Sequence, residues 1–329
     1  MELQLKNIGM IKEANVKIDG LTVIAGENDT GKSTVGKALF ALLKARLFVL
    51  NSKLEYNAQN SQYLQKIEWI FNKISKKQLL NENTFIKIED IEVDFSKKSA
   101  RKGKKKFLDG IFIETPFIFN LYQTLSGINK ANSIIDFEIE YNYLWWDLYI
   151  KLSQKAKTFS NINFKDTLEN IENIIEGVFK KYDEINKDKW VFIKNEKELE
   201  MDNVAMGIKQ FAIIYALIKN GYLTEDRIII FDEPEVHLHP KWQLEMAKIL
   251  VKLVKNGVKI VVNSHSPYMI EALEILSKKE NMNVNFYLAI KEKNYAKIED
   301  VSLDLSPIYD LLSQPIDTLE NMELDNFKW

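Results

Sequence analysis

A short segment near the start of the chain has the residue types and spacing that bind phosphate. It fits the pattern GxxxxGK[ST] and lies between an apolar stretch, residues 21–25, and an apolar helix expected from Ser33. In such a loop, backbone N–H groups and a helix N-terminus surround a phosphate. The phosphate-contacting positions predicted here are Gly26, Glu27, Asn28, Asp29, Thr30, Gly31, Lys32, Ser33 and Thr34. An ordinary glycine turn with a surface lysine is the weaker interpretation.

Two side chains of this segment carry its chemistry. Lys32 would neutralise β- and γ-phosphate oxygens, and Ser33 would bind Mg²⁺. Asp29 stands where such loops often have glycine, and aspartate is one of the few other residues enriched at positive φ. Its negative charge near phosphates acts against binding.

A second candidate is a pair of acids that ends an apolar stretch. Residues 227–232 read as a buried strand, and Asp232 and Glu233 follow at its end. Asp232 suits an outer ligand of Mg²⁺, and Glu233 suits a base that orients an attacking water. Two acids alone are explained equally well as helix-capping or solvated residues. The phosphate loop upstream favours the functional interpretation.

The elements that must position these residues alternate between strand and helix. Strands are expected at residues 1–8, 14–18, 21–25, 110–114, 190–193, 227–232 and 258–263, and helices at 116–125, 168–179, 203–220 and 240–255. This alternation predicts a mainly parallel sheet in an α/β fold. Residues 49–109 are polar and rich in Asn and Lys, with one amphipathic helix around Tyr63 to Ile74, and are expected to be an insertion.

Composition sets few limits on function. The chain has 329 residues, 46% of them hydrophobic, and 45 Lys plus Arg against 47 Asp plus Glu. The balanced charge gives no global sign of nucleic-acid or membrane binding. No cysteine and no run of eighteen apolar residues are present, so a cytoplasmic location with no membrane partner is expected.

The segment from Asp232 to Pro240, together with Asn263 to Pro267, resembles the ABC-type ATPases related to RecF, to SMC-like repair proteins and to the overcoming-lysogenization-defect group. The compact stand-alone members occur in bacterial anti-phage defence systems. The resemblance covers residues 1–48 and 186–300. It implies an ABC-type core with a mixed sheet and a largely helical inserted lobe. The implied divisions are 1–48 for the first part of the core, 49–185 for the lobe, with 110–126 returning to the core, and 186–329 for the rest.

The resemblance also implies residue roles. Lys32, Ser33 and Thr34 would contact phosphate and Mg²⁺, Asp232 would be the Walker B acid, Glu233 the catalytic base, and His265 the residue that senses the γ-phosphate. His237, His239 and His265 could instead bind zinc together with the nearby Asp232 and Glu235, because H-x-H spacing suits it. The first two fit a turn before Pro240 better.

Two further loops are implied. Asn203 to Gln210 is the candidate signature loop, in which Gly207 would bring backbone N–H groups to a partner's γ-phosphate. Relatives commonly have Ser or Thr before that glycine, whereas this chain has Met206. The loop that links the γ-phosphate to the lobe has two candidates, Glu114 and Gln123.

A basic run after residue 96 offers a nucleic-acid site. Lys102, Lys104 and Lys105 are its central members, and such a run can neutralise several phosphates of DNA or RNA. It has no interleaved aromatic residue for base stacking, and a solvated loop explains it at least as well.

These observations lead to three hypotheses. The first is an ATP- and Mg²⁺-dependent ATPase that dimerises on ATP and acts as a switch for a separate effector such as a nuclease. The second is a kinase that transfers the γ-phosphate to a hydroxyl. The third is a non-hydrolysing ATP-binding subunit, for which Met206 and Asp29 are the support.

Overall fold

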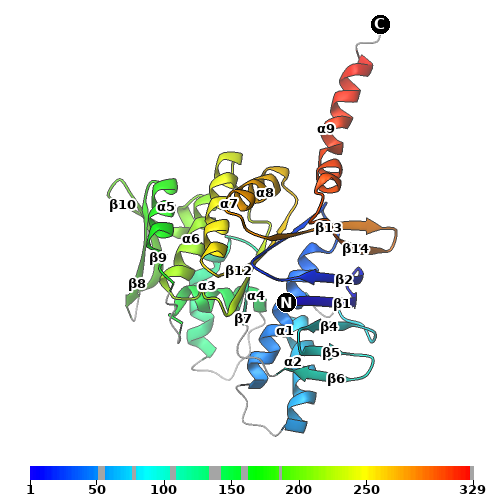
Figure 1. The fold of residues 1–329 in the computed structure, drawn as a ribbon. Coiled ribbons are helices and arrows are strands. Elements are labelled where there is room, and N and C mark those ends of the chain that lie inside the picture. Colours follow the sequence, from blue (N-terminus) through cyan, green and yellow to red (C-terminus); the bar gives the residue numbers. More distant parts are fainter. Residues whose placement is uncertain are drawn as a thin grey trace.

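The computed structural model describes residues 1–50, 56–75, 79–103, 109–132, 142–156, 162–184 and 187–326. Within these ranges an eleven-stranded sheet forms the centre of the molecule, with the order β6-β5-β4-β1-β2-β14-β13-β3-β12-β11-β7 (Figure 1). Its strands are β1 (Glu2–Ile8), β2 (Ile11–Lys17), β3 (Leu21–Ala25), β4 (Phe85–Ile88), β5 (Ile91–Asp94), β6 (Ser99–Lys102), β7 (Asp109–Ile113), β11 (Arg227–Asp232), β12 (Lys259–Ser264), β13 (Val284–Glu292) and β14 (Tyr295–Asp300).

The sheet is mixed, and its two halves differ. From β13 to β7 every neighbouring pair is parallel, whereas β2, β1, β4, β5 and β6 pair antiparallel in turn. The parallel half is nearly continuous apolar sequence, as expected where both faces are covered. This confirms the expected mixed α/β fold. The expectation of a mainly parallel sheet is wrong, because the pairs from β2 to β6 and the pair of β13 with β14 are antiparallel.

Side chains of the parallel strands alternate between two hydrophobic cores. On β11, Ile228 and Ile230 belong to the core beneath α1 (Lys32–Leu50) and α2 (Tyr56–Ser75), whereas Ile229 and Phe231 belong to the other. The second core is covered by α5 (Lys165–Ile175), α6 (Met206–Lys219), α7 (Pro240–Lys255) and α8 (Pro267–Lys279). The sheet therefore lies between two helical layers.

Helix α1 packs closely enough on the sheet to require a glycine. A Cβ atom at Gly36 would lie 2.8 Å from Ile230 Cγ2 and 2.9 Å from Phe112 Cε2. The buried Lys44 ammonium on the same helix lies 2.6 Å from Asp109 Oδ1 and 2.8 Å from Asp147 Oδ1 on α4 (Tyr143–Ser153). These contacts fix the helix that carries Lys32 and Ser33.

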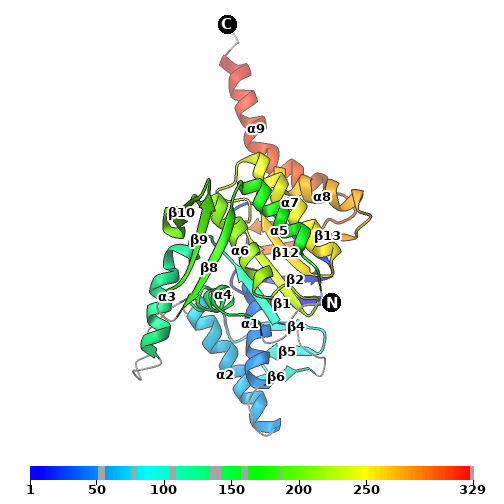
Figure 2. The same ribbon diagram turned by 90° about the vertical axis from the view of Figure 1, so that its left-hand side faces the viewer.

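A smaller sheet lies away from the antiparallel half of the main sheet (Figures 1 and 2). It contains β8 (Val178–Glu184), β9 (Lys187–Lys194) and β10 (Lys197–Glu200), beside α3 (Ile118–Asn132), and the 3-10 turn η1 (Met201–Asn203) follows it. The expectation of one helix across 168–179 is wrong, because α5 ends at Ile175. Glu176 adopts a left-handed conformation with φ of 51° that closes the helix, and Val178 and Phe179 begin β8.

Part of the segment that was expected to be an insertion belongs to the main sheet instead. Strands β4 to β6 extend the main sheet beyond β1, and β7 forms its other edge beside β11. The proposed division at residues 48 and 185 stays a prediction, and the lobe region contributes strands as well as helices.

The last helix, α9 (Ser306–Asn326), extends away from the body in both views (Figures 1 and 2). Within the described ranges, the helices lack the combination of length and apolar character that crossing a membrane requires.

Candidate functional site

The carboxyl ends of four parallel strands meet at one edge of the main sheet. The phosphate loop follows β3, Asp232 ends β11 with Glu233 directly after it, His265 follows β12, and Glu114 follows β7. In register, Asn263 of β12 pairs with both Ile24 of β3 and Asp232 of β11. Open α/β sheets bind ligands at this edge. Residues separated by more than 200 positions are thus brought into one site.

The loop conformation depends on its two glycines. Gly26 has φ of 149°, and a Cβ there would lie 2.5 Å from the Ala289 carbonyl oxygen of β13. Gly31 has φ of 85°. Asp29 also adopts the left-handed region, with φ of 59°, as expected for an aspartate at a glycine-like position. A cavity of about 230 Å³ lies here, lined by Met10, Asn28, Asp29, Thr30, Gly31, Lys32, Ser33, Thr34 and Glu233.

Lys32 is held inside the loop. Its Nζ atom donates to the carbonyl oxygens of Gly26 at 2.8 Å and Glu27 at 2.6 Å, and the residue is only 4% exposed. Burial lowers the pKa of Lys32, and the carboxylates of Glu233 and Asp232 oppose this. The ammonium group is therefore already oriented by backbone oxygens at the floor of the cavity.

Ser33, Asp232 and Asn263 form one hydrogen-bonded group. Asp232 Oδ1 accepts from Ser33 Oγ at 2.9 Å and from Asn263 Nδ2 at 2.8 Å. Burial raises the pKa of Asp232, and both hydrogen bonds oppose this shift. Hydroxyl and carboxylate oxygens at a phosphate loop are the ligands that Mg²⁺ prefers, so these residues fit that ion.

Glu233 and His265 face each other at the rim of the cavity. Glu233 has φ of 55°, an uncommon conformation for glutamate, and its backbone N–H donates to the Asn263 carbonyl oxygen at 2.9 Å. The His265 Nδ1 atom lies 3.2 Å from Glu233 Oε1. This contact raises the pKa of His265 and lowers that of Glu233. The strained backbone aims the Glu233 carboxylate at both the imidazole and the cavity.

Glu235, predicted only as a ligand in the zinc alternative, joins the turn after Glu233 to the loop of His265. One oxygen, Oε1, accepts from Ser264 Oγ at 2.7 Å, from the His265 backbone N–H at 2.9 Å and from the Ser266 backbone N–H at 3.2 Å. The other oxygen, Oε2, is buried without a hydrogen-bond partner. Burial raises the pKa of this carboxyl group. The side chain thus fixes the loop of His265 to the turn after Glu233.

The candidate signature loop lies against the same turn. A Cβ at Gly207 would lie 3.0 Å from the His237 carbonyl oxygen and 3.2 Å from the Trp242 ring. Gln210 Nε2 donates to the Pro234 carbonyl oxygen at 3.3 Å. Helix α6 begins here with Ala205 at its N-cap, which provides no side-chain cap. Gly207 does not line the cavity of its own subunit.

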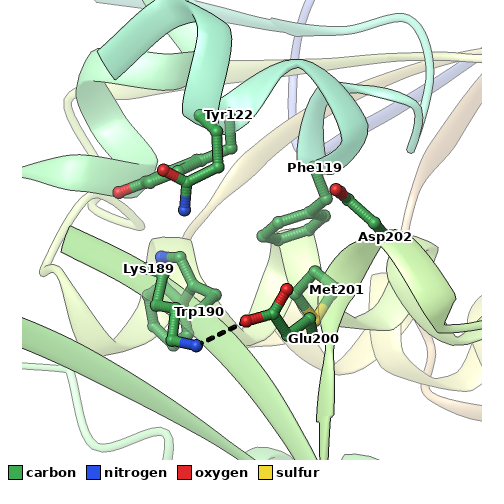
Figure 3. A pocket seen from close by; sticks show the side chains of 8 residues that line it. Phe119, Tyr122, Lys189, Trp190, Glu200, Met201 and Asp202 are labelled. Atoms are coloured by element: carbon green, nitrogen blue, oxygen red, sulfur yellow. Dashed lines mark hydrogen bonds and ion pairs between the residues drawn. The ribbon is translucent and has the colours of Figure 1, made fainter. Parts of the chain in front are cut away.

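The structure separates the two candidates for the loop after β7. Glu114 lies beside the site, because its carboxylate is 3.2 Å from Lys37 Nζ of α1 and accepts from Trp145 Nε1 at 3.0 Å. Gln123 instead lines a small pocket on the lobe, where Lys189 and Glu200 pair at 2.7 Å (Figure 3). Proximity to Asp232 therefore favours Glu114.

The remaining candidates lie elsewhere. Lys102 ends β6, far along the sheet order from the phosphate loop, and Lys104 and Lys105 lie outside the described residues. His239 caps α7 by accepting from the Lys241 backbone N–H at 3.3 Å, and His237 lies in the preceding turn. In the part of the chain that the structure describes, no three His, Cys, Asp or Glu residues gather to hold a metal ion.

The fold and this site define a P-loop ATPase core. Residues 21–271 match the family model described as "AAA domain, putative AbiEii toxin, Type IV TA system". The chain belongs to this family.

Among known proteins, the chain is similar to the Septu protein PtuA of Bacillus thuringiensis, with 23% identity over 303 residues, 83% of this chain and 73% of PtuA. It is also similar to a protein of Vibrio cholerae serotype O1 biovar El Tor named "Retron Vc95 probable ATPase", with 25% identity over 224 residues, 56% of this chain and 42% of that protein. A weak structural similarity is to the SMC head domain from Thermotoga maritima, with a TM-score of 0.45 and 12% identity over 91% of this chain and 98% of that domain.

Proposed function

We propose that the chain binds and hydrolyses ATP, and that ATP closes two copies of it around the nucleotide. The observation that carries this proposal is the Glu233 carboxylate, which lines the phosphate-loop cavity and lies 3.2 Å from His265. A carboxylate in this position can orient a water molecule for attack on the γ-phosphate and take its proton.

The residues around the cavity divide the remaining tasks. Backbone N–H groups of the loop and the Lys32 ammonium bind the phosphates, and Ser33 with Asp232 would hold Mg²⁺. When bound, Mg²⁺ supplies positive charge that neutralises the β- and γ-phosphate oxygens. His265, in contact with Glu233, would respond to the presence of the γ-phosphate.

The N-terminus of α6 supports closure of two copies. Ala205 leaves the first N–H groups of this helix without a side-chain cap, and Ala205 is exposed. Uncapped helix N-termini attract anions. Gly207 does not line the cavity of its own subunit. We therefore propose that it contacts a phosphate bound by a second copy of the chain.

The test compares Glu233→Gln with the wild-type chain and with Glu271→Gln, a matched change of an exposed acid on α8. Removing the base should lower phosphate release by about 10²- to 10⁴-fold while leaving ATP binding intact. The particle mass measured by light scattering should then show a dimer that persists with ATP. A Glu233→Gln protein that binds ATP and never changes its mass would contradict the proposal.

Met206 favours one alternative, a subunit that binds ATP without hydrolysing it. This residue occupies the position before Gly207 and has no hydroxyl donor. Phosphate release by the wild-type chain separates the two functions directly. No release above that of Lys32→Ala would favour the alternative.

We further infer that the chain works with a separate effector, such as a nuclease, in anti-phage defence. The similarity to a Septu protein and to a retron ATPase supports this setting. Plaque counts on cells that carry the chain and its neighbouring gene test it. Protection should be lost with Lys32→Ala and kept with Lys293→Ala, an exposed control.

A further inference from the structure

Asp29 places a negative charge where the proposed ligand is most negative. Its side chain is 72% exposed and lines the phosphate-loop cavity beside Asn28 and Thr30. Its left-handed backbone, with φ of 59°, belongs to the loop conformation itself. A carboxylate in this place would repel a polyphosphate unless its charge were neutralised.

The structure supplies a countercharge from another part of the chain. Lys291 Nζ forms an ion pair with Asp29 Oδ2. The two residues are 262 positions apart in the sequence. The Lys291 side chain is 48% exposed, so the pair is reachable by solvent and by a ligand.

Lys291 lies on strand β13, which runs beside the strand that leads into the phosphate loop. Strand β13 pairs with β3 up to the contact of Leu288 with Ala25, and Ala289 then approaches Gly26 so closely that a Cβ has no room there. Lys291 lies two residues beyond Ala289, on the same side of the strand. The backbone that requires glycine at position 26 therefore also places an ammonium group beside Asp29.

Two other charged groups nearby, those of Lys32 and Glu292, are engaged elsewhere. The Lys32 ammonium is bound to the carbonyl oxygens of Gly26 and Glu27. Glu292, adjacent to Lys291, pairs with Lys297. Among the residues that the structure describes, Lys291 is the cation in ion-pair contact with Asp29.

We infer that Lys291 is a positioning residue of the nucleotide site: by neutralising Asp29 and holding its carboxylate against β13, it allows the loop to accept a triphosphate. The inference rests on the proposed binding of ATP. Because repulsion grows with ligand charge, losing the pair should weaken ATP binding more than ADP binding. For two exposed side chains the expected loss is about twofold to fivefold in the dissociation constant for ATP.

The test is a double-mutant cycle with Lys291→Met, Asp29→Asn and the double variant, using titrations with fluorescent ATP and ADP. Lys291→Met should weaken ATP binding by the stated factor, and Asp29→Asn should restore the affinity in the double variant. Lys293→Met, at an exposed lysine two residues further on, is the matched control and should change nothing. The loss should shrink in about 0.5 M salt, because salt screens exposed charges.

Each failure has a separate meaning. Wild-type protein that binds neither nucleotide would refute the proposed function itself. Wild-type protein that binds ATP while Lys291→Met binds it equally well would overturn the role of Lys291. An equal loss in the Asp29→Asn background would also overturn it, because a lysine that acts only on folding is not rescued by removing the carboxylate.

Discussion

Replacing Glu235 separates its hydrogen-bonding role from its charge. In Glu235→Ala, the hydroxyl of Ser264 and the backbone N–H groups of His265 and Ser266 lose their shared acceptor, Oε1. In Glu235→Gln, an amide oxygen can take the place of Oε1. The amide NH₂ then takes the place of Oε2, which has no partner to lose. Glutamine keeps the size of glutamate and one acceptor oxygen, whereas alanine removes both.

The magnitudes follow from these contacts. The Ser266 N–H keeps Ser264 Oγ as an acceptor at 3.1 Å, so two donors lose their partner. Each buried donor left without an acceptor costs about 1–3 kcal/mol, and the two costs are not additive. Removing a buried carboxylate also relieves the desolvation that raises its pKa, which offsets part of the loss. We expect Glu235→Ala to lower the free energy of unfolding by about 2–4 kcal/mol. We expect Glu235→Gln to lower it by about 1 kcal/mol, because its NH₂ group lacks an acceptor at the place of Oε2 while the loss of a desolvated charge offsets part of that cost.

Urea unfolding measures the stability of both variants, and phosphate release measures their activity. Release should fall in the alanine variant, because His265 is no longer fixed to the turn after Glu233, and should persist in the glutamine variant. Glu271→Ala, at an exposed site, controls for the loss of a surface acid. The reasoning fails if Glu235→Ala is as stable as the wild type, or if Glu235→Gln is destabilised as much as Glu235→Ala.

Three further predictions concern the contact of Glu233 with His265, the packing of Gly207 and the open site at Gly127. The raised pKa of His265 and the lowered pKa of Glu233 mean that their contact stabilises the fold most between pH about 4.5 and 6.5. This stabilisation should be lost as pH rises through the pKa of His265. Two other charged groups act on the imidazole: Glu235 raises its pKa and Lys32 lowers it. Between pH 5 and 9, the free energy of unfolding measured in urea should fall more for the wild type than for His265→Gln. An equal fall in both proteins would refute the prediction. Gly207→Val should cost about 1–3 kcal/mol, because its side chain meets the His237 carbonyl and Trp242. Gly127→Ala in α3 meets no atom within 4 Å and should instead stabilise by about 0.5–1 kcal/mol in thermal unfolding. An unchanged free energy of unfolding in Gly207→Val would contradict this prediction, because it would mean that the turn at His237 can move to accommodate the side chain.

The local signals in the sequence located most of the core elements. The expected strand 21–25 agrees with β3, and the expected helix 240–255 agrees with α7. These succeeded because apolar periodicity and the proline after His239 act within a few residues. The apolar spacing across 168–179 failed because it continued past Glu176, where the left-handed backbone ends the helix.

The residues missed in the site are those whose function depends on distant contacts. The sequence predicted where phosphate, Asp232, Glu233 and His265 would act, and the structure brings these residues to one sheet edge. The contacts of Asn263 with Asp232 and of Lys291 with Asp29 could not be predicted from the sequence, because the order of the strands decides them. Glu235 carried a weak signal, since it is an acid placed among residues of a buried turn.

The strand order also has a consequence for how the chain folds as it leaves the ribosome. The central strands β3, β12, β11 and β7 come from residues 21–25, 259–264, 227–232 and 109–113. Until β12 has been synthesised, β3 has no parallel neighbour, and the apolar residues of β7 and β11 cannot join the strand that bears the phosphate loop. Parallel pairing over such separations is slow, and the waiting segments expose surfaces that promote aggregation. The nucleotide site can therefore form only after residue 264 has been synthesised, although its phosphate loop is among the first segments made.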